Sequence, residues 1–246
     1  VLLDSTPDGW RLDLQRLLDA CTPRTKAIYV NTPNNPTGWV MAEDDLRALL
    51  DFARKRGLWV IVDEVYRRFI YGDAPPPSIL ALAEPDDRLI VTHTFSKNWC
   101  MTGWRVGWAV IPLDLGGVFE NLVQYNTSGT PVFIQRGALA AVAQGDEFLA
   151  SWVARCHQGR DIVGRALAPL PKVQAPPPAG AFYALLQVEG QGDAMALAKA
   201  LVDSAQVGLA PGSAFGPGAE GAVRLCFATS HTTLETAMER LVAALG

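Results

Sequence analysis

LWVIVDE, residues 58–64, joins five consecutive apolar residues to two carboxylates. A short, nearly continuous apolar run is typical of a strand that is buried on both faces of a parallel sheet. Open α/β sheets bind their ligands at the carboxyl ends of such strands. This stretch therefore predicts a central strand that ends, at Asp63 and Glu64, on the ligand-binding edge of a parallel sheet.

The segments on either side predict the rest of that sheet. KAIYVN (26–31) is a β-rich run, and the turn-rich loop TPNNPTG (32–38) follows it. A helical pattern then covers residues 42–56, with acidic residues at its start, basic residues at its end and Gly57 just beyond. RLIVTHT (88–94) and WRVGWAVI (104–111) predict two further strands. We therefore expect an α/β fold with a mainly parallel sheet and helices on both faces.

The second part of the chain has a different order of elements. Helical patterns are predicted near 115–126, 131–144 and 146–169, and the proline-rich VQAPPPAG (173–180) interrupts them. The strand AFYALLQV, a helix from Asp193 to about Gln206, the strand VRLCFA and a helix over 231–245 then predict an α+β tail. We expect residues 1–160 to form a cofactor-binding large domain and residues 161–246 a smaller domain.

Composition excludes several classes of function. The 246 residues carry a net charge of −4 and scattered Lys and Arg, so the basic surface of a nucleic-acid-binding protein is missing. No apolar run approaches the ~20 residues that span a bilayer. Cys21, Cys100, Cys156 and Cys226 are far apart and do not combine with the three histidines in any metal-ligand spacing. We interpret them as buried, reduced thiols, which favours a reducing cytoplasm.

Lys97 raises the question of function, because its neighbours in TFSKNWCMTGWRVGW (94–108) are largely aromatic. Taken singly, Lys97 can be a surface lysine, Asp63 a cap, NNPTG a turn and Arg224 half of an ion pair. Together, however, an amine, a carboxylate, a phenol and an amide follow successive strand ends of one sheet. Pyridoxal phosphate chemistry uses such a set: a lysine forms a Schiff base, an acid keeps the pyridine nitrogen protonated, and cationic and hydroxyl groups bind the phosphate.

The sequence also resembles a known family. PNNPTG (33–38), DEVY (63–66), TFSKNWCMTGWRVGW, GAFY (180–183) and PGSAFGPGAEGAVRLCFA (211–228) resemble, in this order, motifs of the fold-type I, class I/II aminotransferases of the aspartate aminotransferase superfamily. The similarity covers nearly the whole chain. Each motif alone is weak, but the ordered set is specific.

This resemblance implies roles for the residues around the cofactor ring. Lys97 would hold pyridoxal phosphate as a Schiff base and, once released by substrate, move a proton between the α-carbon of the amino acid and the cofactor. Asp63 would pair with the pyridinium nitrogen. Tyr66 and Asn35 would hydrogen-bond the phenolic oxygen of the ring, and these contacts tune the pKa of the Schiff base.

The same resemblance implies how the charged groups of cofactor and substrate are bound. Arg105 would clamp the phosphate with help from Ser96 and from Thr94, which stands where family members often have serine. Arg224 would bind the α-carboxylate of the substrate as a two-pronged fork, a task for which lysine is poorly suited. The implied reaction moves an amino group between an L-amino acid and a 2-oxo acid in a ping-pong cycle.

The chain departs from the family at its beginning. Family members carry an N-terminal portion with a phosphate-binding loop, an aromatic residue stacked on the ring and part of the central sheet, whereas the resemblance here starts at VLLDSTPDGW (1–10). We therefore expect the chain to be N-terminally truncated. The resemblance also implies a homodimer with the active site at its interface, and it does not choose the side chain of the substrate.

Two other functions remain open at this point. The same lysine, aspartate and arginine would serve a pyridoxal phosphate-dependent lyase or a cyclopropane-forming synthase, because the reaction depends on which bond at the α-carbon stands perpendicular to the ring. A ligand-sensing domain of a transcription regulator would have a basic DNA-binding region upstream. A scaffold without cofactor would leave the whole set of polar residues unexplained.

Overall fold

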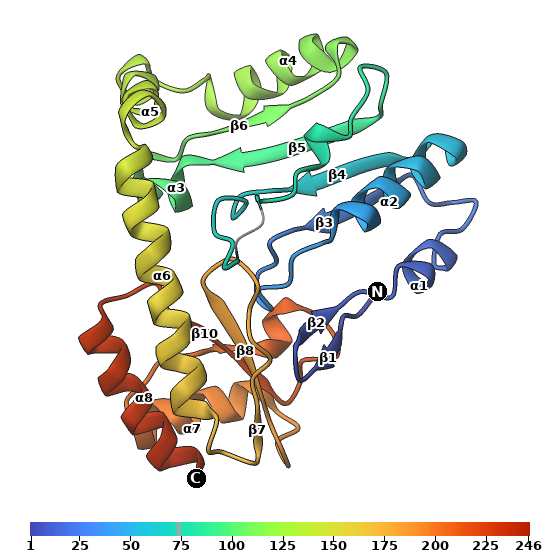
Figure 1. Ribbon diagram of the computed structural model, residues 1–246. Coiled ribbons are helices and arrows are strands. Elements are labelled where there is room, and N and C mark those ends of the chain that lie inside the picture. Colours follow the sequence, from blue (N-terminus) through green and yellow to red (C-terminus); the bar gives the residue numbers. More distant parts are fainter. Residues whose placement is uncertain (73–74) are drawn as a thin grey trace.

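The computed structural model describes residues 1–72 and 75–246, and its first feature is the predicted α/β sheet (Figure 1). The strand order is β3-β4-β5-β6. The strands are β3 (Ala27–Asn31), β4 (Trp59–Asp63), β5 (Leu89–Thr94) and β6 (Gly107–Val110). The first three run parallel, and β6 pairs antiparallel with β5. The prediction of a mainly parallel sheet is confirmed, with an antiparallel strand at one edge.

Helix α2 (Glu43–Arg56) covers one face of this sheet and matches the predicted helix closely. Its first turn is acidic and its last turn basic, which suits the helix dipole, and Gly57 ends it with the left-handed φ of 64°. Leu46, Leu49 and Leu50 of α2 form one core with Val60 and Val62 of β4. The alternating apolar residues of the strands thus hold the sheet to its helix.

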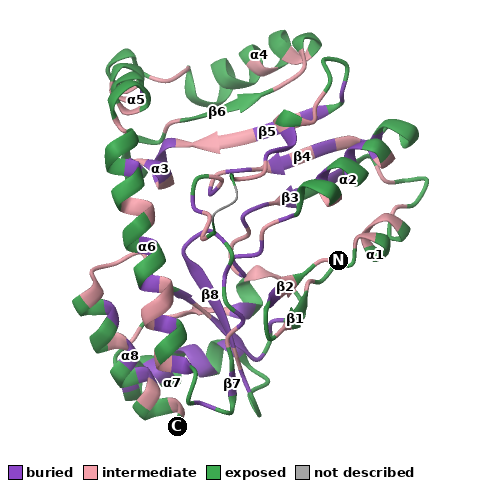
Figure 2. Ribbon diagram, in the orientation of Figure 1, coloured by how far each residue is buried: buried purple, intermediate pink, exposed green. Residues whose placement is uncertain are grey.

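A second sheet of four strands lies below the first in Figure 1. Its order is β7-β8-β10-β9, and all its pairings are antiparallel. The strands are β7 (Val173–Gln174), β8 (Tyr183–Val188), β9 (Ala210–Pro211) and β10 (Ala222–Cys226). The helices beside it are α6 (Asp146–Leu167), α7 (Ala194–Ala205) and α8 (His231–Leu245), and they share one core with β8 and β10. Five of the six residues of β8 are buried, and Figure 2 shows this strand largely in purple.

The region around β6 is packed differently. All four residues of β6 are exposed, and α4 (Gly116–Thr127) has no buried residue among its twelve. The next helix, α5 (Val132–Gln144), buries only Ala138. The exposed apolar side chains of this region include Trp108, Val110, Val118, Leu122, Val123, Tyr125, Val132, Phe133, Leu139 and Val142. This part of the molecule presents an apolar surface that the described residues do not cover.

Several expectations need correction or stay open. Of the four cysteines only Cys156 is buried, so the prediction of buried thiols is wrong for the other three, although all four are free. Cys226 is exposed because it ends β10 on the face that also carries Arg224. A short hairpin of β1 (Asp4–Thr6) and β2 (Gly9–Arg11) and the helix α1 (Leu14–Asp19) were not predicted. The domain boundary after residue 160 stays a prediction, and α6 continues through it.

Candidate active site

The predicted site begins at the carboxyl end of β4, where Asp63 is the last strand residue. The Oδ1 atom of Asp63 accepts the Val65 N–H at 3.1 Å, which folds the chain sharply after the strand. The backbone N–H of Glu64 bonds to Thr92 of the neighbouring β5, so the turn stays attached to the sheet. This turn brings Tyr66 to the same edge of the sheet as Asp63.

Four side chains form a continuous series of contacts from this turn to the second sheet. The hydroxyls of Tyr66 and Tyr183 lie 3.1 Å apart, and both side chains are buried. The Arg224 guanidinium lies over the Tyr183 ring, 4.3 Å from its centroid, and Phe215 flanks it at 4.7 Å. Nη1 of Arg224 donates to Oδ1 of Asn35 at 2.8 Å. Residues from both sheets, separated by up to 189 positions, therefore meet in one place.

Lys97 lies beside this series. It belongs to the short helix α3 (Phe95–Asn98) directly after β5, and its Nζ atom is 5.8 Å from the centroid of the Tyr66 ring. The indole N–H of Trp152 on α6 donates to the Lys97 carbonyl at 3.2 Å, which fixes the backbone. Within residues 1–72 and 75–246, the structure shows no ion pair of the Lys97 amine. Lys97 is half-buried, and its amine lies near an aromatic ring, at a place where an amine could act as a nucleophile.

Asn31 ties two of the predicted residues together. Its Nδ2 donates to the Asp63 carbonyl at 3.1 Å, and its Oδ1 accepts the Asn35 N–H at 2.8 Å. These bonds span the pairing of β3 with β4, in which Asn31 stands opposite Asp63. Asn31 thus holds the backbone of Asp63 and of Asn35 in a fixed relation.

The residues predicted to bind a phosphate are less closely connected. The Thr94 hydroxyl accepts the Ser96 N–H at 3.0 Å and so caps α3, while Ser96 itself is buried. Arg105 has a left-handed φ of 52°, is exposed, and donates to the Thr102 carbonyl at 3.0 Å. The Phe95 N–H bonds to the Val106 carbonyl and brings the two segments side by side. No contact found among the described residues joins Arg105 to Ser96 or Thr94 through their side chains.

Glu64, next to Asp63, is the most buried charged residue at this edge. Its carboxylate accepts a hydrogen bond from the Ser78 hydroxyl, which lies 3.0 Å from Oε1 and 2.9 Å from Oε2, and Oε1 also accepts the Ile79 N–H at 3.0 Å. Arg67 and His93 approach it at 3.8 and 3.9 Å. Burial raises the pKa of Glu64, and the bonds from Ser78 and Ile79 and the charge of Arg67 offset only part of that effect.

Burial also affects the phenols of the contact series. It raises the pKa of Tyr66 well above the usual range, and the hydrogen bond with Tyr183 adds to the increase. The pKa of Tyr183 is raised by burial as well. Both phenols therefore keep their protons at neutral pH and act as hydrogen-bond donors.

The sequence predicts no role for Tyr183, Asn31 or Glu64, although it places Glu64 beside Asp63 on the ligand-binding edge of the sheet. Tyr183 is the last residue of the GAFY motif, which contributes to the family resemblance, but the motif does not indicate which group the Tyr183 hydroxyl contacts. Asn31 is the last residue of β3, and Glu64 comes directly after β4. A polar side chain at the end of an apolar run is the signal by which the sequence could have indicated both residues.

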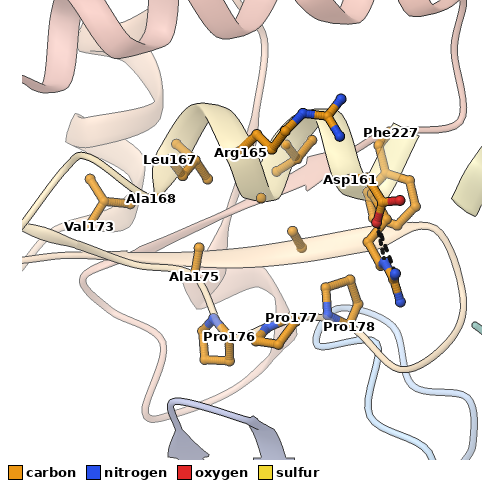
Figure 3. A pocket seen from close by; sticks show the side chains of 14 residues that line it. Asp161, Arg165, Leu167, Ala168, Val173, Ala175, Pro176, Pro177, Pro178 and Phe227 are labelled. Atoms are coloured by element: carbon orange, nitrogen blue, oxygen red, sulfur yellow. Dashed lines mark hydrogen bonds and ion pairs between the residues drawn. The ribbon is translucent and has the colours of Figure 1, made fainter. Parts of the chain in front are cut away.

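One cavity lies away from these residues, between α6 and the proline segment 175–178 (Figure 3). Its volume is about 590 Å³, and none of the residues predicted for the site lines it. Its wall is mostly apolar, and its acidic residue Asp161 is already paired with Arg160 at 2.9 Å. This cavity is therefore separate from the predicted site.

Comparison with known proteins gives the family. The family model described as aminotransferase class I and II matches residues 2–241. The chain belongs to the class I and II aminotransferases. Among its relatives in this family are a probable aspartate/prephenate aminotransferase of Aquifex aeolicus, 34% identical over 96% of the chain, and an aspartate aminotransferase of Pyrococcus abyssi, 37% identical over 94%. The predicted family is confirmed.

Solved aminotransferases have the same fold. The aromatic aminotransferase from Pyrococcus horikoshii OT3 superposes with a TM-score of 0.90 at 34% identity, covering 96% of this chain and 64% of that one. The fold-type I assignment is thereby confirmed. The chain spans about 60% of the length of the curated aminotransferases it matches.

The residues at the site fit the cofactor of such an aminotransferase. The half-buried Lys97 amine, the Asp63 carboxylate and the Tyr66 phenol meet at one sheet edge, and the buried Nε of Arg224 has no hydrogen-bond partner in the part of the chain that the structure describes. An unpartnered buried donor favours a bound acceptor. In that part of the chain no helix is long and apolar enough to cross a membrane, and no cluster of His, Cys, Asp and Glu could hold a metal ion.

Proposed function

We propose that the protein is a pyridoxal phosphate-dependent aminotransferase that moves an amino group between an L-amino acid and a 2-oxo acid. The observation that carries the proposal is the series of contacts from Lys97 through Tyr66 and Tyr183 to Arg224 and Asn35. It joins a nucleophilic amine to a carboxylate-binding guanidinium, the two groups that an amino-acid substrate requires.

Pyridoxal phosphate, when bound, supplies an aldehyde that reacts with amines and a ring that stabilises negative charge at the α-carbon of the amino acid. The Lys97 amine would hold the cofactor covalently and would later carry the proton at the α-carbon. The Asp63 carboxylate would pair with the ring nitrogen, and the Tyr66 hydroxyl and the Asn35 amide would hydrogen-bond the phenolic oxygen. Arg105, Ser96 and Thr94 would bind the phosphate.

Arg224 decides the class of substrate. A guanidinium stacked between two aromatic rings keeps a fixed plane, and such a group binds a carboxylate through two parallel hydrogen bonds. The substrate therefore carries a free α-carboxylate. The names of the relatives include aspartate, aromatic and N-acetyl-LL-diaminopimelate aminotransferases, so the side chain varies within the family.

The working form we propose is a homodimer in the cytoplasm. The apolar surface of β6, α4 and α5 favours association with a second copy, because soluble proteins rarely leave large apolar patches exposed. The four free cysteines suit a reducing compartment. Sedimentation equilibrium tests the first point, and a monomer at micromolar concentration would contradict it.

The absorption spectrum tests the proposed activity. Purified protein with added pyridoxal phosphate should show a Schiff-base band near neutral pH. L-amino acids, given without any 2-oxo acid, should convert it to the pyridoxamine form, and a 2-oxo acid should restore it. A band that forms but does not convert would reject transamination in favour of another reaction. No band at all would mean that these 246 residues do not form a complete cofactor site.

A further inference from the structure

Tyr29 occupies an unusual place in the middle of β3. Its neighbours Ile28 and Val30 are 4% and 6% exposed and belong to the core formed with α2. Tyr29 itself points to the opposite face of the sheet and is 62% exposed. A large aromatic residue on an open sheet face gains little from burial there, so its hydroxyl is the part to examine.

That hydroxyl reaches across to the neighbouring strand. It donates to Oδ2 of Asp63 at 3.2 Å, while Oδ1 of the same carboxylate accepts the Val65 N–H at 3.1 Å. Each oxygen of Asp63 therefore has one donor from the protein. Because a carboxylate oxygen accepts two hydrogen bonds, each still has room for another donor. The two hydrogen bonds fix the orientation of the carboxylate plane and leave each oxygen able to accept one more hydrogen bond.

Asn31, two residues along β3, holds the Asp63 backbone through its carbonyl. The same strand thus fixes the main chain of Asp63 with one residue and its side chain with another. Partial burial of the hydroxyl, together with the charge of Asp63 and the hydrogen bond to it, raises the pKa of Tyr29 to about 12. The phenol accordingly remains a donor throughout the neutral range.

We propose that Tyr29 is a positioning residue for Asp63: its hydroxyl orients the carboxylate toward the cofactor's ring nitrogen. The inference rests on the proposed function and adds to it a residue that no motif of the sequence singled out. Phenylalanine at position 29 would fill the same space on the sheet and leave Oδ2 without its donor.

Y29F tests the proposal, with S204A as a control that also removes one hydroxyl, because Ser204 on α7 is exposed and lies outside the proposed site and interface. Y29F should bind pyridoxal phosphate about tenfold more weakly, the lower end of what a hydrogen bond to a charged group contributes. Its Schiff-base band should also shift in wavelength, whereas a purely structural residue would leave the band in place. S204A should match the wild type in both measurements. An unchanged affinity and band in Y29F would overturn the proposal.

A double-mutant cycle identifies the partner. If Tyr29 acts through Asp63, Y29F should have little further effect on cofactor affinity in a D63N background. An equal loss in both backgrounds would overturn the proposal.

A measurement without cofactor keeps the inference separate from the proposed function. In protein labelled with ¹³C at the tyrosine Cζ, the signal that Y29F removes should move when D63N is introduced. An unmoved signal would show that the contact does not exist. If the signal moves but wild-type protein forms no Schiff base, only the proposed function and the role built on it fail, and the contact stands.

Discussion

The two sheets of this molecule distribute polar and apolar residues in opposite ways. In the sheet of β3 to β6 the polar side chains gather at the strand ends, and β6 is exposed along its whole length. In the sheet of β7 to β10 the central strand β8 is almost entirely apolar and buried. The second sheet contributes one charged side chain, Arg224, and one phenol, Tyr183, to the site of the first. Chemistry and packing are therefore separable, and substitutions in the two sheets should have different consequences.

The largest effect on chemistry should come from Lys97→Ala. Removing the amine removes both the covalent attachment and the proton carrier, so the Schiff-base band should disappear and turnover should fall by about 10⁴-fold, the upper range for acid–base catalysis. Borohydride trapping followed by mass spectrometry measures the attachment. Lys199→Ala, on the exposed face of α7, should behave as the wild type. A trapped adduct in the Lys97 variant would contradict this prediction, because another amine would then attach the cofactor.

The opposite result should come from Leu186→Ala in β8. Leu186 is completely buried, and truncating such a residue lowers the free energy of unfolding by about 2–5 kcal/mol. Urea unfolding measures this loss. At urea concentrations below the unfolding transition the Schiff-base band should be intact, because Leu186 is not among the residues predicted to bind the cofactor. Val202→Ala, at an exposed position of α7, should lower the free energy by less than about 0.5 kcal/mol. A stable Leu186 variant without the band would show that packing and chemistry are not separable.

Arg224→Lys tests the contribution of the second sheet to the proposed site, because Arg224 of β10 is the charged side chain that this sheet provides. Lysine keeps the charge but loses the fork and the stacking between Tyr183 and Phe215. The KM for the amino acid should rise by about 10- to 100-fold, as expected for the loss of one charge-assisted bond. The affinity for pyridoxal phosphate should be unchanged. Arg240→Lys on α8 serves as the control, and an unchanged KM for Arg224→Lys would remove this residue from the substrate site.

Much of the fold could be predicted from the sequence, because its signals are local. The apolar runs of β4 and β5 and the charged ends of α2 gave strands and a helix within a few residues of their true bounds. The contacts of the site depend on register instead. Tyr29 meets Asp63 only because Asn31 stands opposite Asp63, and Tyr66 meets Tyr183 across 117 positions. The prediction that Cys226 is buried was wrong for a similar reason. Val223 and Leu225 face the core, so Cys226 lies on the opposite face of β10, and the sequence alone does not show which face the helices cover.

Glu64→Gln removes a buried carboxylate from the sheet to which we assign the chemistry. Burial raises the pKa of Glu64, so the folded state holds this proton more tightly than the unfolded chain. Its contribution to stability is then complete below the unfolded pKa of about 4.3 and is lost as the pH rises through the folded value. Gln is neutral at every pH. The free energy of unfolding of Glu64→Gln relative to wild type should therefore increase as the pH rises from 4 to 8.

Unfolding of both proteins in urea across this pH range measures the difference, and Glu239→Gln, exposed on α8, should give a flat difference. Arg67 and His93 also face the Glu64 carboxylate. Because burial lowers the pKa of His93, the Arg67 guanidinium is the cation that opposes the effect in the upper part of the range. A difference that decreases with pH would mean that Arg67 stabilises the Glu64 carboxylate by more than burial destabilises it. Glu64 would then be an ion-pair partner of the turn that holds Asp63, and charge rather than packing would stabilise this edge of the sheet.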